Sequence, residues 1–392
     1  MISGLTRKLN LSHVLAIIIG TVIGSGVFIN LPIVARETGS PMLAVVAWLI
    51  GGLIWIPQIF ILTELGAAYP KEGFGYLYLK EAGSKPLAFL YGWTVFWTSD
   101  TPSITIITLS ASSALAYCWP ELENSLPGKL FAASIIICLT AVHFRDVKQG
   151  GNLQILLTAA KISPLIVIIF AGFFHLNDGN LFVLPEIVAK HTSLFTLLVA
   201  GVAATTWSYA GFPNVLYMAG EIKNPQRNLP IVLFGSVLGI ICAYVLIALA
   251  TSAIVPHDDL IAISGTFANP FKYLPGFASV AGAFLAIAAF ISMIGASNAR
   301  IMVQPRIEYA MACDGLFFKI FGRIHPKFHT PHYSILLQSS LAIVLLFVGN
   351  IESLLGYFTL FYLLQNALVY ATIFRLLPNL NIIQPIAPHF GW

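Results

Sequence analysis

Small residues and prolines interrupt two otherwise apolar segments, and these interruptions are where the chain is best equipped for chemistry. The segment HVLAIIIGTVIGSGVFINLP (13–32) carries at its centre Gly20, Gly24, Ser25 and Gly26. The segment LFTLLVAGVAATTWSYAGFPNVLYMAG (194–220) carries at its centre Ser208, Gly211 and Pro213. Such breaks unwind a helix and leave backbone amides and carbonyls available to a ligand. The chemistry they predict is binding, with no bond made or broken.

The two breaks expose opposite ends of the peptide dipole. The first frees amides near Ser25 and Gly26, at the start of a half-helix whose positive end attracts a carboxylate. The second frees carbonyls near Trp207, Ser208 and Ala210, which attract an ammonium group. Together they predict a site for a zwitterionic α-amino acid, formed by Val22, Ile23, Gly24, Ser25 and Gly26 and by Trp207, Ser208, Tyr209, Ala210 and Gly211. The alternatives are close helix packing through the Gly20/Gly24 pair and an ordinary proline kink.

Composition places these segments in a lipid bilayer. The chain has 392 residues, of which 58% are hydrophobic and only 9% charged, and its mean hydropathy is +0.86. Soluble domains carry about 25% charged residues. Apolar stretches long enough to cross about 30 Å of hydrocarbon recur along the chain, and strand-like alternation is absent, which favours helices. The predicted spans are 12–36, 42–69, 86–117, 129–143, 152–175, 193–219, 229–254, 275–311, 331–349 and 352–376.

Positive charges alternate between the connections of these ten spans. Thirteen Lys and Arg residues fall on one side and four on the other, namely Arg36, Lys129, Lys190 and Lys272. Cytoplasmic connections carry the excess of positive charge, so both termini are expected in the cytoplasm. Each break opens a block of five spans, so the two blocks have opposite orientations. We expect a single membrane domain of two halves, residues 1–192 and 193–392.

Five segments resemble the amino acid–polyamine–organocation (APC) superfamily. They are GTVIGSGVF (20–28), ELGAAYPKEGFGYLYLKEAG (64–83), GEIKNPQRNLP (220–230), and YAMACDG (309–315) with IHPKFHTP (324–331). Within the superfamily the chain looks closest to the L-type amino acid transporters and their bacterial relatives. The resemblance implies an all-α integral membrane fold, the LeuT-like five-plus-five inverted repeat with discontinuous helices 1 and 6.

The resemblance also implies a mechanism. Amides around Ser25 and Gly26 would hold the substrate carboxylate, carbonyls of Trp207, Ser208 and Ala210 the amine, and Trp207 would act as the outer gate. Helices 1 and 6 would rock against helices 3, 4, 8 and 9 in alternating access. The chain departs from the pattern in having ten helices where most members have twelve, and in Gln304-Pro305-Arg306, where a proline kink is expected.

Lys161 lies roughly 14 Å into the fifth span at 1.5 Å per residue, close to the midplane. It is either a functional cation or a lysine that snorkels to the interface. In similar L-type and proton-dependent transporters, a lysine here occupies the place of a sodium ion and bonds carbonyls of the first helix. The resemblance therefore predicts sodium-independent transport, as an exchanger or a proton symporter.

Asp100 is an unusual charge in the third span. It is either a partner for a substrate cation, which would favour a basic amino acid or a polyamine, or part of a structural pair or a water-exposed vestibule. Glu64, Arg300 and Arg306 are expected to form ion pairs at the inner gate, with purely interfacial positions as the alternative.

No cofactor, metal or enzymatic activity is expected. The four cysteines have no paired spacing, the histidines have no metal spacing, and no hydrolase or nucleotide motif occurs. A channel, a membrane enzyme and an inactive truncated paralogue are the weaker alternatives.

The expected partners are an amino acid and the lipid of the cell (inner or plasma) membrane, with no nucleic acid. Animal L-type members link to a glycoprotein subunit near the position of Cys118. We interpret Cys118 as an ordinary thiol without such a subunit, and leave a homodimer open.

Overall fold

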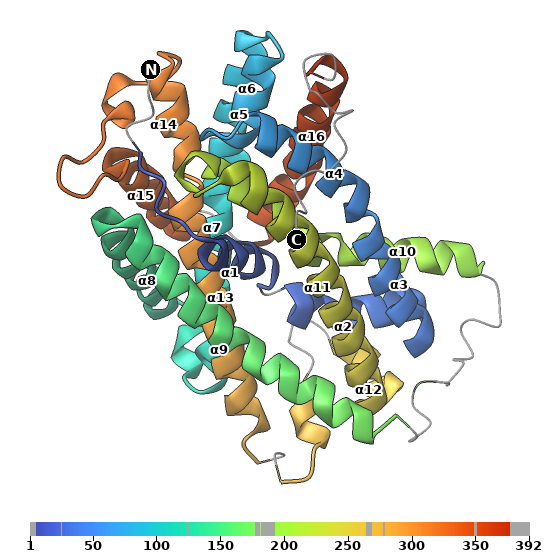
Figure 1. Cartoon of the computed structure of the whole chain (residues 1–392). Coiled ribbons are helices and arrows are strands. Elements are labelled where there is room, and N and C mark those ends of the chain that lie inside the picture. The colour runs from blue at the N-terminus through green and yellow to red at the C-terminus, as the bar shows by residue number, and fades with distance from the viewer. Residues whose placement is uncertain are drawn as a thin grey trace.

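The computed structural model describes residues 5–24, 26–123, 125–176, 181, 193–263, 269–276, 279–348 and 351–376, with only the backbone of residues 28, 29 and 351–359. Across these ranges the regular structure is helical, apart from two isolated β-bridges. Figure 1 shows the helices crossing one another at varied angles around the centre of the molecule. The prediction of an all-α fold is confirmed.

Ten spans can be followed along the helices. The first five spans are α1 (Leu11–Val22) with α2 (Gly26–Thr38), α3 (Pro41–Leu53) with α4 (Trp55–Ala68), α6 (Lys85–Val95) through α7 (Thr101–Ala114), α8 (Leu126–Arg145) and α9 (Val147–Phe174). The next five are α10 (Leu194–Tyr209) with the 3₁₀ turn η6 (Phe212–Tyr217), α11 (Pro225–Ile254), α13 (Ala281–Val303) with α14 (Arg306–Cys313), α15 (His332–Val348) and α16 (Ile351–Leu376). Two short helices, α5 (Phe74–Glu81) and α12 (His257–Ala262), lie between spans.

Six helical stretches in the described part are long and apolar enough to cross a membrane, and they include the interrupted sixth and eighth spans. The other four predicted spans, which are the first, third, ninth and tenth, are not among these six. The predicted boundary between the two halves falls next to residues outside the described ranges, so the division at residue 192 stays a prediction.

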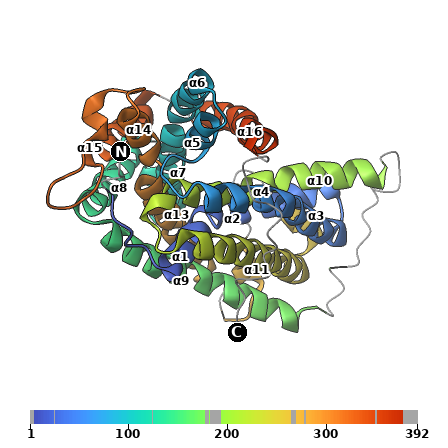
Figure 2. The ribbon, with the colours of Figure 1, turned by 45° about the horizontal axis from the view of Figure 1, so that its top comes forward.

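The apolar side chains form two separate cores. One core lies among α7, α8, α13 and α15, the third, fourth, eighth and ninth spans, and includes Ile104, Ile136, Met293 and Ile335. The larger core unites the first, second, fifth, sixth and seventh spans with parts of the tenth, and it also includes residues of the third span and of both ends of the eighth, such as Tyr91, Leu285 and Met302. Figure 2 shows α8, α13 and α15 gathered on one side, and α2, α3, α4 and α10 on the other. The first core gathers the four spans that the sequence resemblance assigns to the scaffold, and the division into a scaffold and a mobile bundle stays a prediction.

Prolines explain two departures from regular helix. Pro102 cannot donate a backbone hydrogen bond and its ring crowds the preceding turn. The turn before it widens into a π-helix at Phe96–Asp100, where the Thr101 amide donates to the carbonyl of Phe96. π-Helical turns often mark functional sites. Likewise α13 stops at Val303 and α14 starts after Pro305, so the break expected at Pro305 is present.

Candidate functional site

The two interrupted spans meet at their breaks. A Cβ placed on Gly26 would lie 2.8 Å from the Cα of Ser208, and one on Gly211 would lie 2.9 Å from the carbonyl of Thr21. Side chains at these glycines would therefore force the spans apart. The Thr21 hydroxyl donates to the Gly211 carbonyl at 3.1 Å, which joins the end of one half-helix to the break of the other. The prediction that both spans are discontinuous is confirmed, and they lie in contact.

The first break leaves carbonyls that are held by side chains of other spans. The Lys161 ammonium group, 1% exposed, donates to Gly20 at 3.0 Å and to Ile23 at 2.6 Å. The Ser292 hydroxyl donates to the carbonyl of Gly24 at 3.2 Å. Because carbonyls in the bilayer interior need partners, these contacts allow α1 to end in mid-membrane. Lys161 therefore does not snorkel to an interface.

The second break is centred on Gly211. After α10 ends at Tyr209, Ala210 is extended and Gly211 takes φ +137°, a conformation that side-chain-bearing residues rarely adopt. The chain then continues as the 3₁₀ turn η6, so the last carbonyls of α10 have no continuing α-helix to bond them. Ala210 donates its amide to the carbonyl of Trp207 at 3.3 Å. The break therefore presents a helix C-terminus, the negative end of its dipole.

Tyr244 of α11 connects both breaks. Its buried hydroxyl lies 3.2 Å from the carbonyl of Val22 and 3.1 Å from that of Ser208. One hydroxyl proton serves one carbonyl at a time, so the two break carbonyls share this donor. A carbonyl has two lone pairs, which leaves Ser208 able to accept from a ligand as well.

A cavity of about 300 Å³ lies between the breaks, and we call it the break chamber. Its lining is Thr21, Val22, Gly24, Gly26, Ile107, Trp207, Ala210, Ala296 and Arg300. The start of α2 and the end of α10 both border this space, so it combines the positive end of one helix dipole with the negative end of another.

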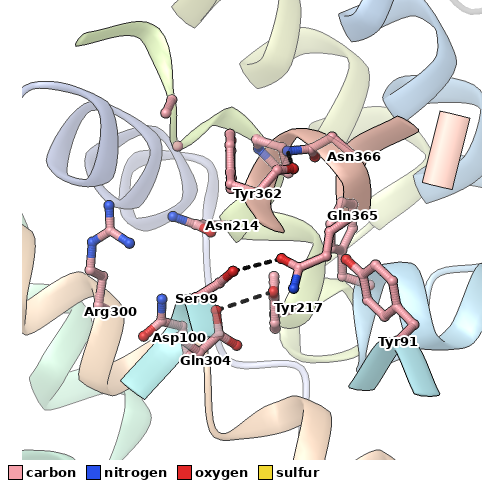
Figure 3. Close-up of a pocket in the computed structure, with 14 residues that line it drawn as sticks. Tyr91, Ser99, Asp100, Asn214, Tyr217, Arg300, Gln304, Tyr362, Gln365 and Asn366 are labelled. Atoms are coloured by element: carbon pink, nitrogen blue, oxygen red, sulfur yellow. Dashed lines mark hydrogen bonds between the residues drawn. The ribbon is translucent and has the colours of Figure 1, made fainter. Parts of the chain in front are cut away.

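A second cavity of about 420 Å³ adjoins the first, with Ala210 and Arg300 in the lining of both. We call it the polar chamber (Figure 3). Its polar lining residues are Tyr91, Ser99, Asp100, Asn214, Tyr217, Arg300, Gln304, Tyr362, Gln365 and Asn366. The π-helical turn places Ser99 and Asp100 here, where the Ser99 hydroxyl donates to Gln365 at 2.6 Å and Tyr217 donates to Asp100 at 3.4 Å.

The structure brings together most of the predicted site residues. Those that line a chamber are Val22, Gly24, Gly26, Trp207, Ala210, Gly211 and Asp100. Ile23 contributes its carbonyl to Lys161, and Ser208 packs against Gly26. The side chain of Tyr209 points to the neighbouring span, where its hydroxyl donates to the carbonyl of Trp48 at 2.8 Å. Ser25 lies outside the described residues.

Several polar chamber residues were missed by sequence reasoning. Asn214, Gln304 and the adjacent pair Gln365 and Asn366 are amides in apolar spans, and all four line the polar chamber. Their one signal is polarity where the bilayer disfavours it. Which face of each helix they occupy depends on the breaks at Pro102, Gly211 and Pro305, and helical periodicity alone does not give it.

Ion pairs on the face that carries the N-terminal segment differ from those expected. Arg306 pairs with Glu221, at 2.8 Å with both side chains 1% exposed, while Arg300 lines the chambers. The expected pairing with Glu64 is therefore wrong: Glu64 is half-buried and its side chain forms no ion pair with these arginines in the described structure. The connection between α10 and α11 places Glu221 beside Arg306. A contact between residues so far apart in the sequence cannot be derived from the span assignments.

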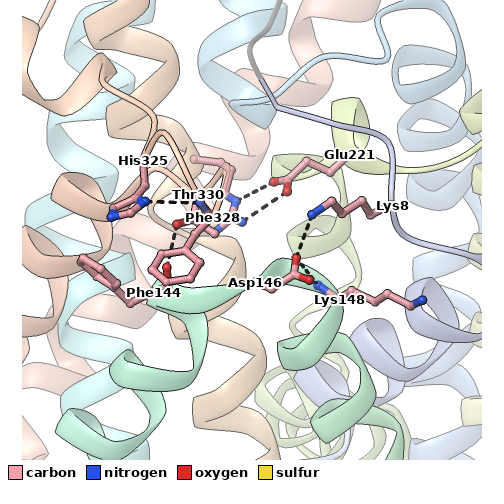
Figure 4. Close-up of polar contacts among 9 residues, drawn as sticks. Lys8, Phe144, Asp146, Lys148, Glu221, His325, Phe328 and Thr330 are labelled. Carbon is pink, nitrogen blue, oxygen red and sulfur yellow. Dashed lines mark hydrogen bonds and ion pairs between the residues drawn. The ribbon is translucent and has the colours of Figure 1, made fainter.

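Further contacts close this face (Figure 4). Lys8 pairs with Asp146 at 3.1 Å, and the Leu9 backbone pairs with Glu221 and Lys223 on either side of Ile222. They join the N-terminal segment to the loops after α8 and after α10.

Elsewhere on this face, Lys80 and Tyr76 of α5 contact Asp314 at 2.6 and 2.7 Å. Burial and this hydrogen bond raise the pKa of the Tyr76 phenol above its usual value.

Comparisons with known proteins agree with this geometry. The family described as amino acid permease matches residues 9–377. The serine/threonine exchanger SteT of Bacillus subtilis is 28% identical over 90% of this chain and 79% of its own. The mouse (Mus musculus) b(0,+)-type amino acid transporter 1 is 30% identical over 91% and 73%. The crystal structure of MhsT in complex with L-phenylalanine covers 90% of this chain and 81% of that one, with TM-score 0.58 and 14% identity, and shows the same fold.

Proposed function

The chain belongs to the amino acid permease family, and on that premise we propose that it carries α-amino acids across a membrane by alternating access. The observation that carries the proposal is the contact between two helix breaks of opposite polarity around the break chamber. The substrate carboxylate would lie at the amides that open α2, around Gly24 and Gly26. The substrate ammonium would lie at the carbonyls that close α10, from Trp207 to Ala210.

Two features support a rocking motion. The two apolar cores allow α7, α8, α13 and α15 to stay together while the broken spans move against them. On the side of the break chamber where α2 and α10 pack together, Gly26 lies against Ser208 and Trp207, and we propose Trp207 as the gate on that side. On the other side the buried pair Arg306–Glu221 and the N-terminal segment close the path. Opening to that side would separate these contacts.

Lys161 supports transport without sodium. Its ammonium group is a fixed cation that donates to two carbonyls at the end of α1. A bound metal cation would need those same oxygens, because hard cations take carbonyl ligands. The protein therefore carries its own positive charge at this position.

We propose a cell membrane location, and the excess of positive charge on one set of connections supports an orientation with both termini in the cytoplasm. Exchange is the transport mode that we propose, because the related SteT is named as an exchanger.

A channel would need a continuous ring of carbonyls or charges. The described breaks instead enclose one compartment between two packed spans.

Uptake by the purified protein in liposomes tests the proposal. Vesicles preloaded with unlabelled L-amino acids should accumulate labelled amino acid by counterflow, equally in sodium and in choline buffers, and empty vesicles should accumulate far less. Equal uptake in empty and preloaded vesicles, driven by a pH gradient, would replace exchange with proton symport. Strong sodium dependence would contradict the role of Lys161. Absence of saturable uptake for every amino acid, with sugars and polyamines as comparison solutes, would refute an amino acid carrier.

A further inference from the structure

Three side-chain atoms in the polar chamber lack a hydrogen-bond partner although they are buried (Figure 3). They are Asp100 Oδ2, Arg300 Nε and Gln304 Oε1, on side chains that are 4%, 6% and 1% exposed. Buried polar groups in native proteins nearly always have partners. Three unpartnered atoms around one cavity therefore indicate a missing ligand group.

These atoms do not satisfy one another. Asp100 and Arg300 line the same cavity, yet they form no ion pair or hydrogen bond with each other. The other oxygen of Asp100 accepts from Tyr217, and the amide nitrogen of Gln304 donates to Ser103 at 3.1 Å. Among the buried atoms without a partner there are thus one donor, at Arg300, and two acceptors, at Asp100 and Gln304.

A primary carboxamide is the complement of this set. It presents one carbonyl acceptor and two N–H donors in one plane. We infer that the polar chamber binds the carboxamide side chain of the transported amino acid, so that asparagine or glutamine is the preferred substrate class. The carbonyl would accept from Arg300, and the NH₂ group would donate to Asp100 and to Gln304.

Other side chains fit the chamber less well. A basic side chain would satisfy Asp100 but would place a second positive charge beside Arg300, which disfavours the basic amino acid or polyamine suggested by Asp100 alone. An acidic side chain would satisfy Arg300 and face two acceptors. An aliphatic side chain would leave all three atoms unpaired, and sites built for hydrogen bonds reject such analogues strongly.

The position of the chamber agrees with this assignment. Ala210 and Arg300 line both cavities, so a side chain leaving the break chamber past Ala210 enters the polar chamber directly. This inference rests on the proposed function, since it assumes that the backbone ends of the substrate lie at the breaks.

Competition for uptake tests the inference. Liposomes that contain the wild-type protein are assayed for labelled L-alanine counterflow against unlabelled glutamine, asparagine, glutamate, lysine and leucine. We expect a carboxamide to inhibit at concentrations about 100-fold lower than its competitors of similar size. Comparable inhibition by leucine, or preference for glutamate or lysine, would overturn the inference while alanine counterflow preserves the proposed function. No counterflow of any amino acid would refute both.

Two substitutions provide a reciprocal test. With Asp100→Asn, the positive charge of Arg300 is no longer balanced, so the ratio of glutamate to glutamine affinity should rise about tenfold. With Arg300→Gln, the ratio of lysine to glutamine affinity should rise by a similar factor. Asp259→Asn and Arg323→Gln make the same chemical changes at positions outside the chambers and should leave both ratios as in the wild type. Misfolding cannot raise the glutamate ratio in one variant and the lysine ratio in the other. If both ratios stay unchanged, the assignment is wrong.

Discussion

Replacing Lys161 by methionine tests how much the first break depends on its ammonium group. Methionine keeps an unbranched side chain, one atom shorter, beside Gly295 but removes the donor to Gly20 and Ile23. A hydrogen bond from a charged donor contributes about 1.5–3 kcal/mol, so two of them contribute about 3–6 kcal/mol. Since about 1.4 kcal/mol corresponds to a factor of ten, even the lower value predicts a loss of about 100-fold in uptake efficiency.

The assay is the initial rate of amino acid counterflow over a range of substrate concentrations. Lys148→Met is the matched control, because Lys148 is exposed at the start of the same helix and lies far from the break. We expect kcat/KM to fall about 100-fold for Lys161→Met and to stay within a factor of two for Lys148→Met. If Lys161→Met protein of normal thermal stability transported like the wild type, the ammonium group would not hold the break in its active conformation.

Three further changes have defined outcomes. Gly211→Ala should abolish counterflow and lower the melting temperature, because φ +137° and the Thr21 carbonyl 2.9 Å away leave no room for a Cβ; normal uptake would show that the break relaxes freely. Glu221→Gln should destabilise the fold by about 3–5 kcal/mol, because it leaves the buried charge of Arg306 without its partner; an unchanged melting temperature in detergent would contradict this. Tyr244→Phe should reduce uptake about tenfold, since it removes the hydroxyl shared by both breaks at a cost of about 1.5 kcal/mol, and wild-type kinetics would show that the hydroxyl is dispensable.

The breaks could be predicted from sequence because their cause is local. Gly26 permits the close approach of the two spans, Gly211 adopts an unusual backbone angle, and proline follows two residues later at position 213. Helix rise placed Lys161 near the midplane, and the family resemblance placed its ammonium group at the carbonyls of the first span. The structure then supplied the contact partners, Gly20 and Ile23.

The polar chamber could not be predicted in the same way. Its lining comes from four spans and the short helix α5, and the widened turn before Pro102 and the stop before Pro305 rotate Asp100 and Gln304 away from the positions of a regular helix. Glu221 shows the same limit, since a loop residue far along the chain replaced Glu64 as the partner of Arg306. Local patterns specify where helices break, and tertiary packing decides which polar groups the breaks bring together.

The most direct test is competition by amino acids modified at the α-carboxylate or the α-ammonium group. It shows whether the two breaks bind both charged groups of a zwitterion. The amino acid with the fastest counterflow is compared with its α-carboxamide, which lacks the carboxylate, and with its N-acetyl derivative, which lacks the ammonium group. We predict that the unmodified amino acid competes and that each derivative is weaker by at least about 100-fold, as expected when charge-assisted hydrogen bonds are lost. Equal competition by either derivative would show that the corresponding break does not bind the substrate, and would contradict the account.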